Sequence, residues 1–179
     1  MQIQFGGGTL FVNLADQTYN NVGIFTSVGG TDKENGGVMR IGQPRVKQVF
    51  TENDHDEPSA QWTEGRDVYF DVTLAEMTLS NLALSLGINP NQIGSDGSAT
   101  YLTVVGSESI TYFPAVYQVL QDGQTNKYYW LTLPVCEILN AVEVGFKDDE
   151  PVQLKLSLKA HKATTGTLVG MKFQIKADK

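Results

Sequence analysis

Between residues 66 and 87 the spacing of apolar residues changes from every second position to the spacing of a helix, without interruption. In residues 68–74 every second side chain is apolar, which predicts a strand with one buried face. Thr78 is suited to cap a helix that begins there, and Gly87 is suited to end it in a left-handed conformation. A short helix is therefore expected at about 78–86, with one apolar stripe. The expected stripe consists of Leu79, Leu82, Ala83 and Leu86.

Elsewhere, apolar runs between clusters of Gly, Asn, Asp and Pro predict further strands. With 68–75, the expected strands are 9–14, 22–28, 46–51, 99–105, 115–120, 127–133, 152–161 and 167–176. The fold class is therefore mainly β, a β-sandwich or barrel-like subunit with one flanking helix, and residues 1–179 are expected to form a single domain.

Two hairpins are expected. The strands at 152–161 and 167–176 would form a long closing hairpin. A second hairpin would join 45–51 to 66–76 through a long polar loop at 52–65. In the register that matches both charges and apolar groups, Arg45 lies opposite Asp71 and Val49 lies opposite Asp67.

The net charge of the chain indicates which partners it can bind. The chain has 13 Lys and Arg against 20 Asp and Glu, a formal charge of −7. An acidic protein of this kind is not expected to grip phosphates. No apolar run approaches the roughly 18 residues that a membrane span needs, so no membrane anchoring is expected. The start, MQIQFGGG, lacks the basic and apolar regions of a signal peptide, which favours synthesis in the cytoplasm.

Few residues could carry chemistry. The single Cys136 has no partner for an internal disulfide and is expected to be a buried, reduced thiol. The glycine clusters at 5–8, 29–30 and 36–37 do not open a helix in a phosphate-binding motif, so they are interpreted as backbone hinges. No nucleophile stands in a motif with a base. We therefore expect neither an enzyme nor a cofactor.

The segment 52–57 gathers four carboxylates around His55 and has the composition of a Ca²⁺ site. The residue order of an EF-hand is missing, so a solvated loop, or a loop that docks on another subunit, is favoured and no metal is expected. Leu84 lies about 140° around the helix from Leu79, off the expected stripe. With Leu86 and Ile88 it is a candidate for a contact between subunits.

The segment DVYFDVTLAEMTLSNLALSLG, residues 67–87, together with the long loop before it and the closing hairpin, resembles the tail tube, or major tail, proteins of long-tailed bacteriophages and their relatives in bacterial injection machines. This resemblance implies a structural virion protein whose hexameric rings stack into a hollow tail tube, the conduit for DNA ejection into the host cell. Its partners would be further copies of itself and the tape-measure, tail terminator and tail-tip proteins. DNA would pass through the lumen without specific binding, and assembly would take place in the bacterial cytoplasm.

The resemblance also implies roles for particular segments. Residues 1–8 would form an N-terminal arm, represented by Gln2, Ile3 and Phe5. The long loop would contact the next ring through Glu52, Asp54, His55, Asp56, Glu57 and Trp62. The candidate lumen-facing residues are Asp67 and Asp71, with Arg45 and Lys47 on the same face as partial neutralisers.

Two alternatives remain open. One is the tube protein of a phage-related contractile injection or secretion system, which would have the same fold and ring. The other is a monomeric carbohydrate-binding β-sandwich module, in which aromatic side chains such as Trp62 and Trp130 would stack on sugars.

Overall fold

The computed structural model describes residues 1–14, 25–31, 36–49, 60–88, 93–103, 112–139 and 153–179, with the backbone alone for residues 49 and 60–64. The predicted strand residues 22–24, 50–51, 104–105 and 152 lie outside these ranges. The elements are β1 (Gln2–Gln4), β2 (Thr9–Val12), β3 (Thr26–Gly30), β4 (Gly37–Ile41), β5 (Arg45–Val49), β6 (Ala60–Gly65), β7 (Val68–Leu74), α1 (Leu79–Ser85), β8 (Ile93–Ser95), β9 (Thr100–Leu102), β10 (Phe113–Leu120), β11 (Tyr128–Ile138), β12 (Leu154–Ala160) and β13 (Gln174–Ala177).

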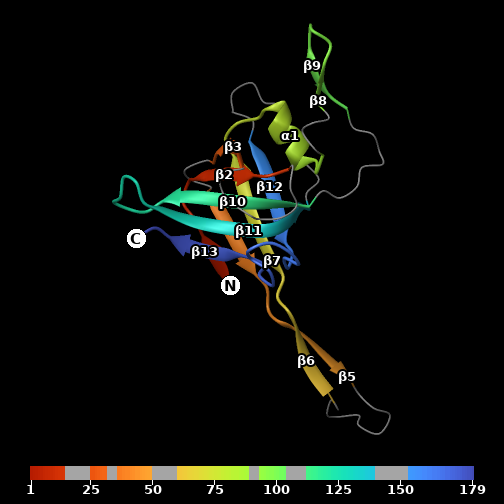
Figure 1. The fold of residues 1–179 in the computed structure, drawn as a ribbon, viewed down its shortest axis with the longest axis vertical. Coiled ribbons are helices and arrows are strands. Elements are labelled where there is room, and N and C mark those ends of the chain that lie inside the picture. Colours follow the sequence, from red (N-terminus) through yellow and green to blue (C-terminus); the bar gives the residue numbers. More distant parts are fainter. Residues whose placement is uncertain (15–24, 32–35, 50–59, 89–92, 104–111, 140–152) are drawn as a thin grey trace.

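One strongly bent antiparallel sheet forms two packed layers. The strand order is β1-β4-β7-β12-β11-β10-β2-β3, and β13 pairs with β11. The first layer is β1, β4, β7 and β12, and the second is β11, β10, β2 and β3. In Figure 1 the strands of the second layer cross those of the first at a steep angle, the orthogonal form of sheet packing. The expected mainly β, sandwich or barrel-like fold with one short helix is confirmed.

The core lies between these layers. The alternation predicted for 68–74 is confirmed, because Val68, Phe70, Val72 and Leu74 are all at most 2% exposed. The ring of Phe70 on β7 lies 5.1 Å from that of Tyr117 on β10, and Phe5 packs edge-on against both at 6.2 Å. Aromatic contacts therefore join the two layers at their centre.

The N-terminal segment belongs to this core. Strand β1 pairs with β4, with Gln2 opposite Arg40 and Ile3 opposite Met39. Phe5 and Ile3 pack on the hydrophobic cluster. The N-terminal arm expected at residues 1–8, with Gln2, Ile3 and Phe5, stays a prediction. In the single subunit, Ile3 and Phe5 pack on its own core, because burying apolar side chains is favourable, whereas Gln2 is exposed.

Helix α1 forms where it was predicted. The Thr78 hydroxyl accepts a hydrogen bond from the Asn81 amide at 3.1 Å, and Gly87 follows the helix with φ 73°. The predicted buried stripe is correct for Ala83, which is 0% exposed, and for Leu82, which packs against the core. It is wrong for Leu79 and Leu86, which are 36% and 41% exposed, whereas Leu84 and Ile88 are both 3% exposed.

The buried face of the helix includes two polar residues that the sequence pattern concealed. Asn81, Leu84, Ser85 and Ile88 share the i, i+3, i+4, i+7 spacing and are all buried. The side-chain amide of Asn81 donates to the Glu76 carbonyl at 3.0 Å, and the Ser85 hydroxyl donates to the Leu82 carbonyl at 2.7 Å. Because both polar groups are satisfied locally, they can be buried with little cost.

Strands β4 and β5 return as β6 and β7 in one long hairpin, but in a register that differs from the predicted one. Strand β5 pairs with β6, with Lys47 opposite Trp62, while β4 pairs with β7, with Val38 opposite Asp71. The predicted register, in which 45–49 pairs with 67–71, is therefore wrong. Residues 60–65 also belong to a strand rather than to a loop. Strand β4 takes the place opposite β7, so Arg40 rather than Arg45 neutralises Asp71.

The predicted closing hairpin does not form. Strand β12 pairs with β7 and β11, and β13 pairs with β11. Between them, Gly166 and Gly170 adopt φ of 83° and 85°, and the Ala163 amide donates to the Met171 carbonyl at 2.9 Å. These left-handed glycines reverse the chain early, so that only Gln174–Ala177 is left as a strand.

Candidate functional site

The β5–β6 hairpin stands apart from the body and is called the long arm (Arg45–Val49 with Ala60–Gly65). It forms its own two-stranded sheet, and Figure 1 shows it extending away from the two layers. The Arg45 guanidinium pairs with the Asp67 carboxylate at its root, where the Gly42 amide also donates to the Asp67 carbonyl at 2.8 Å. Val46 is 47% exposed on the arm. A two-stranded hairpin outside a larger sheet is marginally stable in water, which favours a partner for this arm.

The predicted ring-stacking residues divide between two parts of the arm. Trp62 lies on β6, opposite Lys47 on β5. The other five lie in the segment that joins the two strands, outside the described residues: Glu52, Asp54, His55, Asp56 and Glu57.

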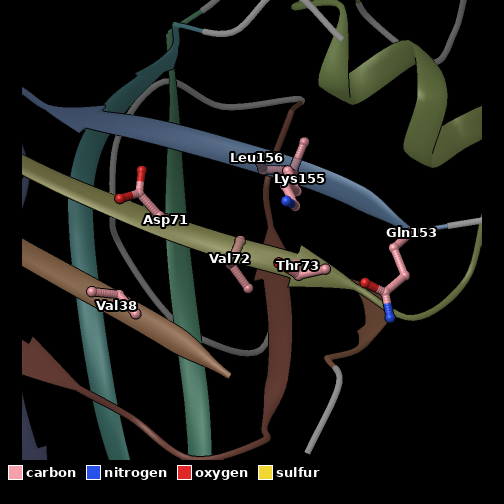
Figure 2. A pocket seen from close by; sticks show the side chains of 7 residues that line it. All are labelled: Val38, Asp71, Val72, Thr73, Gln153, Lys155 and Leu156. Atoms are coloured by element: carbon pink, nitrogen blue, oxygen red, sulfur yellow. The ribbon is translucent and has the colours of Figure 1, made fainter. Parts of the chain in front are cut away.

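The exposed face of the first layer is polar. The Arg40 guanidinium pairs with Asp71 at 2.7 Å and lies 5.9 Å from the centre of the Tyr69 ring, while the Ser157 hydroxyl donates to Asp71 at 2.5 Å. A shallow hollow of about 350 Å³ lies on this face (Figure 2), lined by Val38, Asp71, Val72, Thr73, Gln153, Lys155 and Leu156. Asp71 is the one carboxylate among the described residues that line the hollow, and it already has two partners.

The candidate lumen-facing residues do not form an acidic surface. Asp67 pairs with Arg45 and Asp71 pairs with Arg40. Lys47 is exposed on the arm. The two aspartates are therefore offset by neighbouring cations, as the sequence suggested, but Arg45 lies beside Asp67 and Arg40 takes the place expected for Arg45 beside Asp71.

Of the three candidate intersubunit residues at the helix, two are buried and one is exposed. Leu84 and Ile88 are buried in the subunit's own interior and are unavailable to a neighbour, so these two predictions need correction. Leu86 is exposed, and Leu79, seven residues earlier on the same side of the helix, is exposed as well. The apolar surface that α1 offers consists of Leu79 and Leu86.

A charged cluster that the sequence did not predict lies at the junction of the two layers, where β11 pairs with β12. Glu137 on β11 is 7% exposed, and its carboxylate lies 3.5 Å from the Lys159 ammonium and 2.9 Å from Nε2 of His161. The Tyr112 ring packs edge-on against His161 with the centroids 5.3 Å apart. His161 is half-buried rather than a surface residue. This cluster joins β11 to β12. Finding it from the sequence would have required the pairing register of these two strands, which places Glu137 opposite Lys159.

Cys136 is buried, as predicted, with 0% exposure, and its thiol donates to the Phe113 carbonyl at 3.0 Å. Burial, aided by the charge of Glu137, raises the pKa of this thiol well above its usual range. A protonated, inaccessible thiol cannot act as a nucleophile at neutral pH.

The glycine clusters allow close backbone packing. A Cβ atom on Gly8 would lie 2.3 Å from the Gln118 carbonyl oxygen, and one on Gly36 would lie 2.2 Å from the Phe5 carbonyl oxygen. Beside Gly8, the Tyr117 hydroxyl donates to the Gly6 carbonyl at 2.9 Å. These glycines hold the N-terminal segment against the second layer.

The charges are unevenly distributed along the chain. Eleven of the 13 Lys and Arg lie in the described residues, but only eight of the 20 Asp and Glu do, so the described part carries 11 − 8, or +3. The six remaining segments carry 2 − 12, or −10. The acidity of the chain thus resides in segments that connect the strands and not in the β body.

Three strands of the sheet have a strand partner on one side only among the residues that the structure describes. Strand β1 pairs with β4, β3 pairs with β2, and β13 pairs with β11. Just beyond β3, Thr31 forms an isolated bridge to Leu74 on β7. All four residues of β13 are exposed, and Ile175 on this strand and Tyr129 on β11 are 43% and 44% exposed. An open strand edge beside exposed apolar side chains is a template for pairing with another chain.

Within the described ranges, no three His, Cys, Asp or Glu side chains are grouped to hold a metal ion, and the carboxylates around His55 lie outside those ranges. No helix of the described part is long and apolar enough to cross a membrane. A scan of the chain against protein-family models finds no match, and a search of curated proteins finds no relative.

Proposed function

We propose that this protein is a structural virion protein that assembles with copies of itself into hexameric rings, which stack into a hollow tail tube for DNA ejection. The observation that carries the proposal is the long arm, a two-stranded sheet that extends from the body and has exposed side chains on β5. Ordering a separate two-stranded hairpin costs conformational entropy, and a contact with another copy would offset that cost.

The open edges of the sheet support the same proposal. Strands β1 and β13 could each continue into a neighbouring copy by main-chain hydrogen bonds. Closing a sheet into a ring removes such edges and with them the risk of uncontrolled pairing. The exposed Leu79 and Leu86 on α1 would add apolar contact between copies.

The charge distribution suits a conduit. Six copies at −7 give −42 per ring, which disfavours binding of DNA to the tube wall. Since Asp67 and Asp71 are paired with cations, the repulsion would come from the acidic connecting segments that carry −10 per copy. In this role the tape-measure, tail terminator and tail-tip proteins are the further partners, and the tail of the virion is the location.

The long arm provides a direct test. In the test variant Arg45–Gly65 is replaced by Asn-Gly, so that β4 and β7 are joined by a short loop in which Asn-Gly stands between residues 42–44 and 66–67. The arm forms a separate sheet, so the body should keep its fold. By analytical ultracentrifugation, the wild type should sediment as rings of about 118 kDa, six copies of 19.6 kDa, and as longer stacks at high concentration. The armless variant should form rings that do not stack. Stacks of wild-type length from the armless variant would contradict the role of the arm.

A further inference from the structure

A cavity of about 490 Å³ opens at the root of the long arm, and it is called the basic cavity. Its charged lining consists of Arg66, Lys162 and Lys172, and its apolar lining includes Ile41, Met171 and Phe173. Three cations beside an apolar floor are suited to a ligand that combines carboxylates with an apolar group.

The cations of the cavity lack partners of opposite charge. Among the described residues, no carboxylate lies within ion-pair distance of Arg66 or Lys162. The Lys172 ammonium donates to the Arg66 carbonyl at 2.6 Å, which fixes it beside the arm but does not neutralise it. The neighbouring Asp67 is already paired with Arg45.

The positive charge of the cavity contrasts with the charge of the whole chain. Arg66, Lys162 and Lys172 line it together. The cavity is therefore a concentration of positive charge on a chain whose overall charge is −7.

We propose that the basic cavity receives the acidic segment 52–57 of a second copy of the chain, a contact that rests on the proposed self-assembly and gives it a specific surface. This segment has four carboxylates and no Lys or Arg, so its charge complements that of the cavity. Phe50, two positions before Glu52, supplies an apolar side chain for the floor of the cavity.

The position of the arm favours a second copy. The segment joins Val49 to Ala60 at the end of the arm, whereas the cavity lies at its root, about 16 Å away along the five residues of β5. Figure 1 shows that the arm carries this end away from the body. A contact between the arm end of one copy and the arm root of the next is heterologous, so it can repeat from copy to copy and build a stack.

Charge reversal and charge exchange test this contact in the full-length protein. The variant Arg66→Glu/Lys162→Glu changes two exposed side chains and should keep the fold, but it should lose stacking. Combining it with Glu52→Lys, Asp54→Lys, Asp56→Lys and Glu57→Lys should restore stacking, because the segment is then positive and the cavity, with two Glu against Lys172, is net negative. Lys127→Glu/Lys179→Glu, with the same change of net charge at two exposed positions outside the cavity lining, should stack like the wild type.

A peptide separates this contact from assembly as a whole. The synthetic peptide FTENDHDEPSA, residues 50–60, should bind the wild-type protein, and more tightly at low salt. The control peptide FTQNNHNQPSA, in which amides replace the carboxylates, and the Arg66→Glu/Lys162→Glu variant should each weaken binding about tenfold or more. Fluorescence anisotropy of labelled peptides measures the affinities.

The outcomes distinguish this inference from the proposed function. If the wild type stacks and the reversed variant stacks equally, the inference is overturned while the tube function stands. If the wild type forms no rings but the acidic peptide binds and the reversed variant does not bind it, the cavity is supported and the tube function fails. Equal binding of the acidic and amide peptides overturns the inference.

Discussion

Replacing Leu84 and Leu86 by alanine separates the two faces of helix α1. Leu84 is 3% exposed and belongs to the hydrophobic core, while Leu86 is 41% exposed. Each substitution removes three carbon atoms, worth about 2.4 kcal/mol by transfer when they are fully buried. A residual cavity raises the expected cost for Leu84→Ala to roughly 3 kcal/mol, within the 2–5 kcal/mol usual for such sites. For Leu86→Ala we expect less than about 1 kcal/mol, because much of the side chain is in water and alanine favours the helix.

Urea unfolding followed by circular dichroism, at concentrations where the protein is monomeric, measures both values. For a chain of this length, about 3 kcal/mol corresponds to a fall in Tm of roughly 6–12 °C. The slope of the free energy of unfolding against urea concentration should stay unchanged in both variants. If Leu84→Ala costs no more than Leu86→Ala, the orientation of the helix described above is refuted. If Leu86 contacts a neighbouring copy, Leu86→Ala should weaken assembly while the stability of the monomer is retained.

Three further outcomes follow from buried groups. Gly8→Ala should lower the free energy of unfolding by about 1–3 kcal/mol in urea titrations, because its Cβ would collide with the Gln118 carbonyl, whereas Gly30→Ala, with no atom within 4 Å and no positive φ, should cost less than about 1 kcal/mol. The Cys136 thiol should react with an aromatic disulfide reagent only at the rate of unfolding, and fast reaction in the native protein would contradict its burial. Burial raises the pKa of Tyr117, so above about pH 10 only the unfolded chain loses this proton and stability falls as pH rises. Tyr117→Phe should reduce that fall. An identical dependence of stability on pH in the variant and the wild type would contradict the raised pKa of Tyr117.

Local pattern was sufficient for the elements that depend on it. The strand at 68–74 and the helix after Thr78 follow from alternation, a capping side chain and a left-handed glycine, all of which act within a few residues. The burial of Cys136 followed from its apolar surroundings in the same way.

Pairing across the sheet could not be inferred from pattern. The stretch 37–41 contains a glycine and an arginine and has little apolar alternation, yet it forms β4 and takes the place opposite β7. Once that place was taken, the register expected for Arg45 was excluded. Which strand pairs with which depends on contacts between residues far apart in sequence.

The candidate site shows the same limit. The helix face was mispredicted because Asn81 and Ser85 are polar in the sequence but satisfied by nearby carbonyl groups in the fold. The basic cavity brings Arg66 together with Lys162 and Lys172, about a hundred residues later, so no local motif could have marked it. The acidic segment 52–57 was visible from composition alone.

The central claim is that the sheet edges and the long arm of this chain contact further copies of it. Negative-stain electron microscopy of the purified protein at high concentration tests this claim most directly. We predict rings with sixfold symmetry in class averages, and tubes made of stacked rings. A uniform population of single 19.6-kDa particles, at every concentration and salt condition tested, would contradict the account.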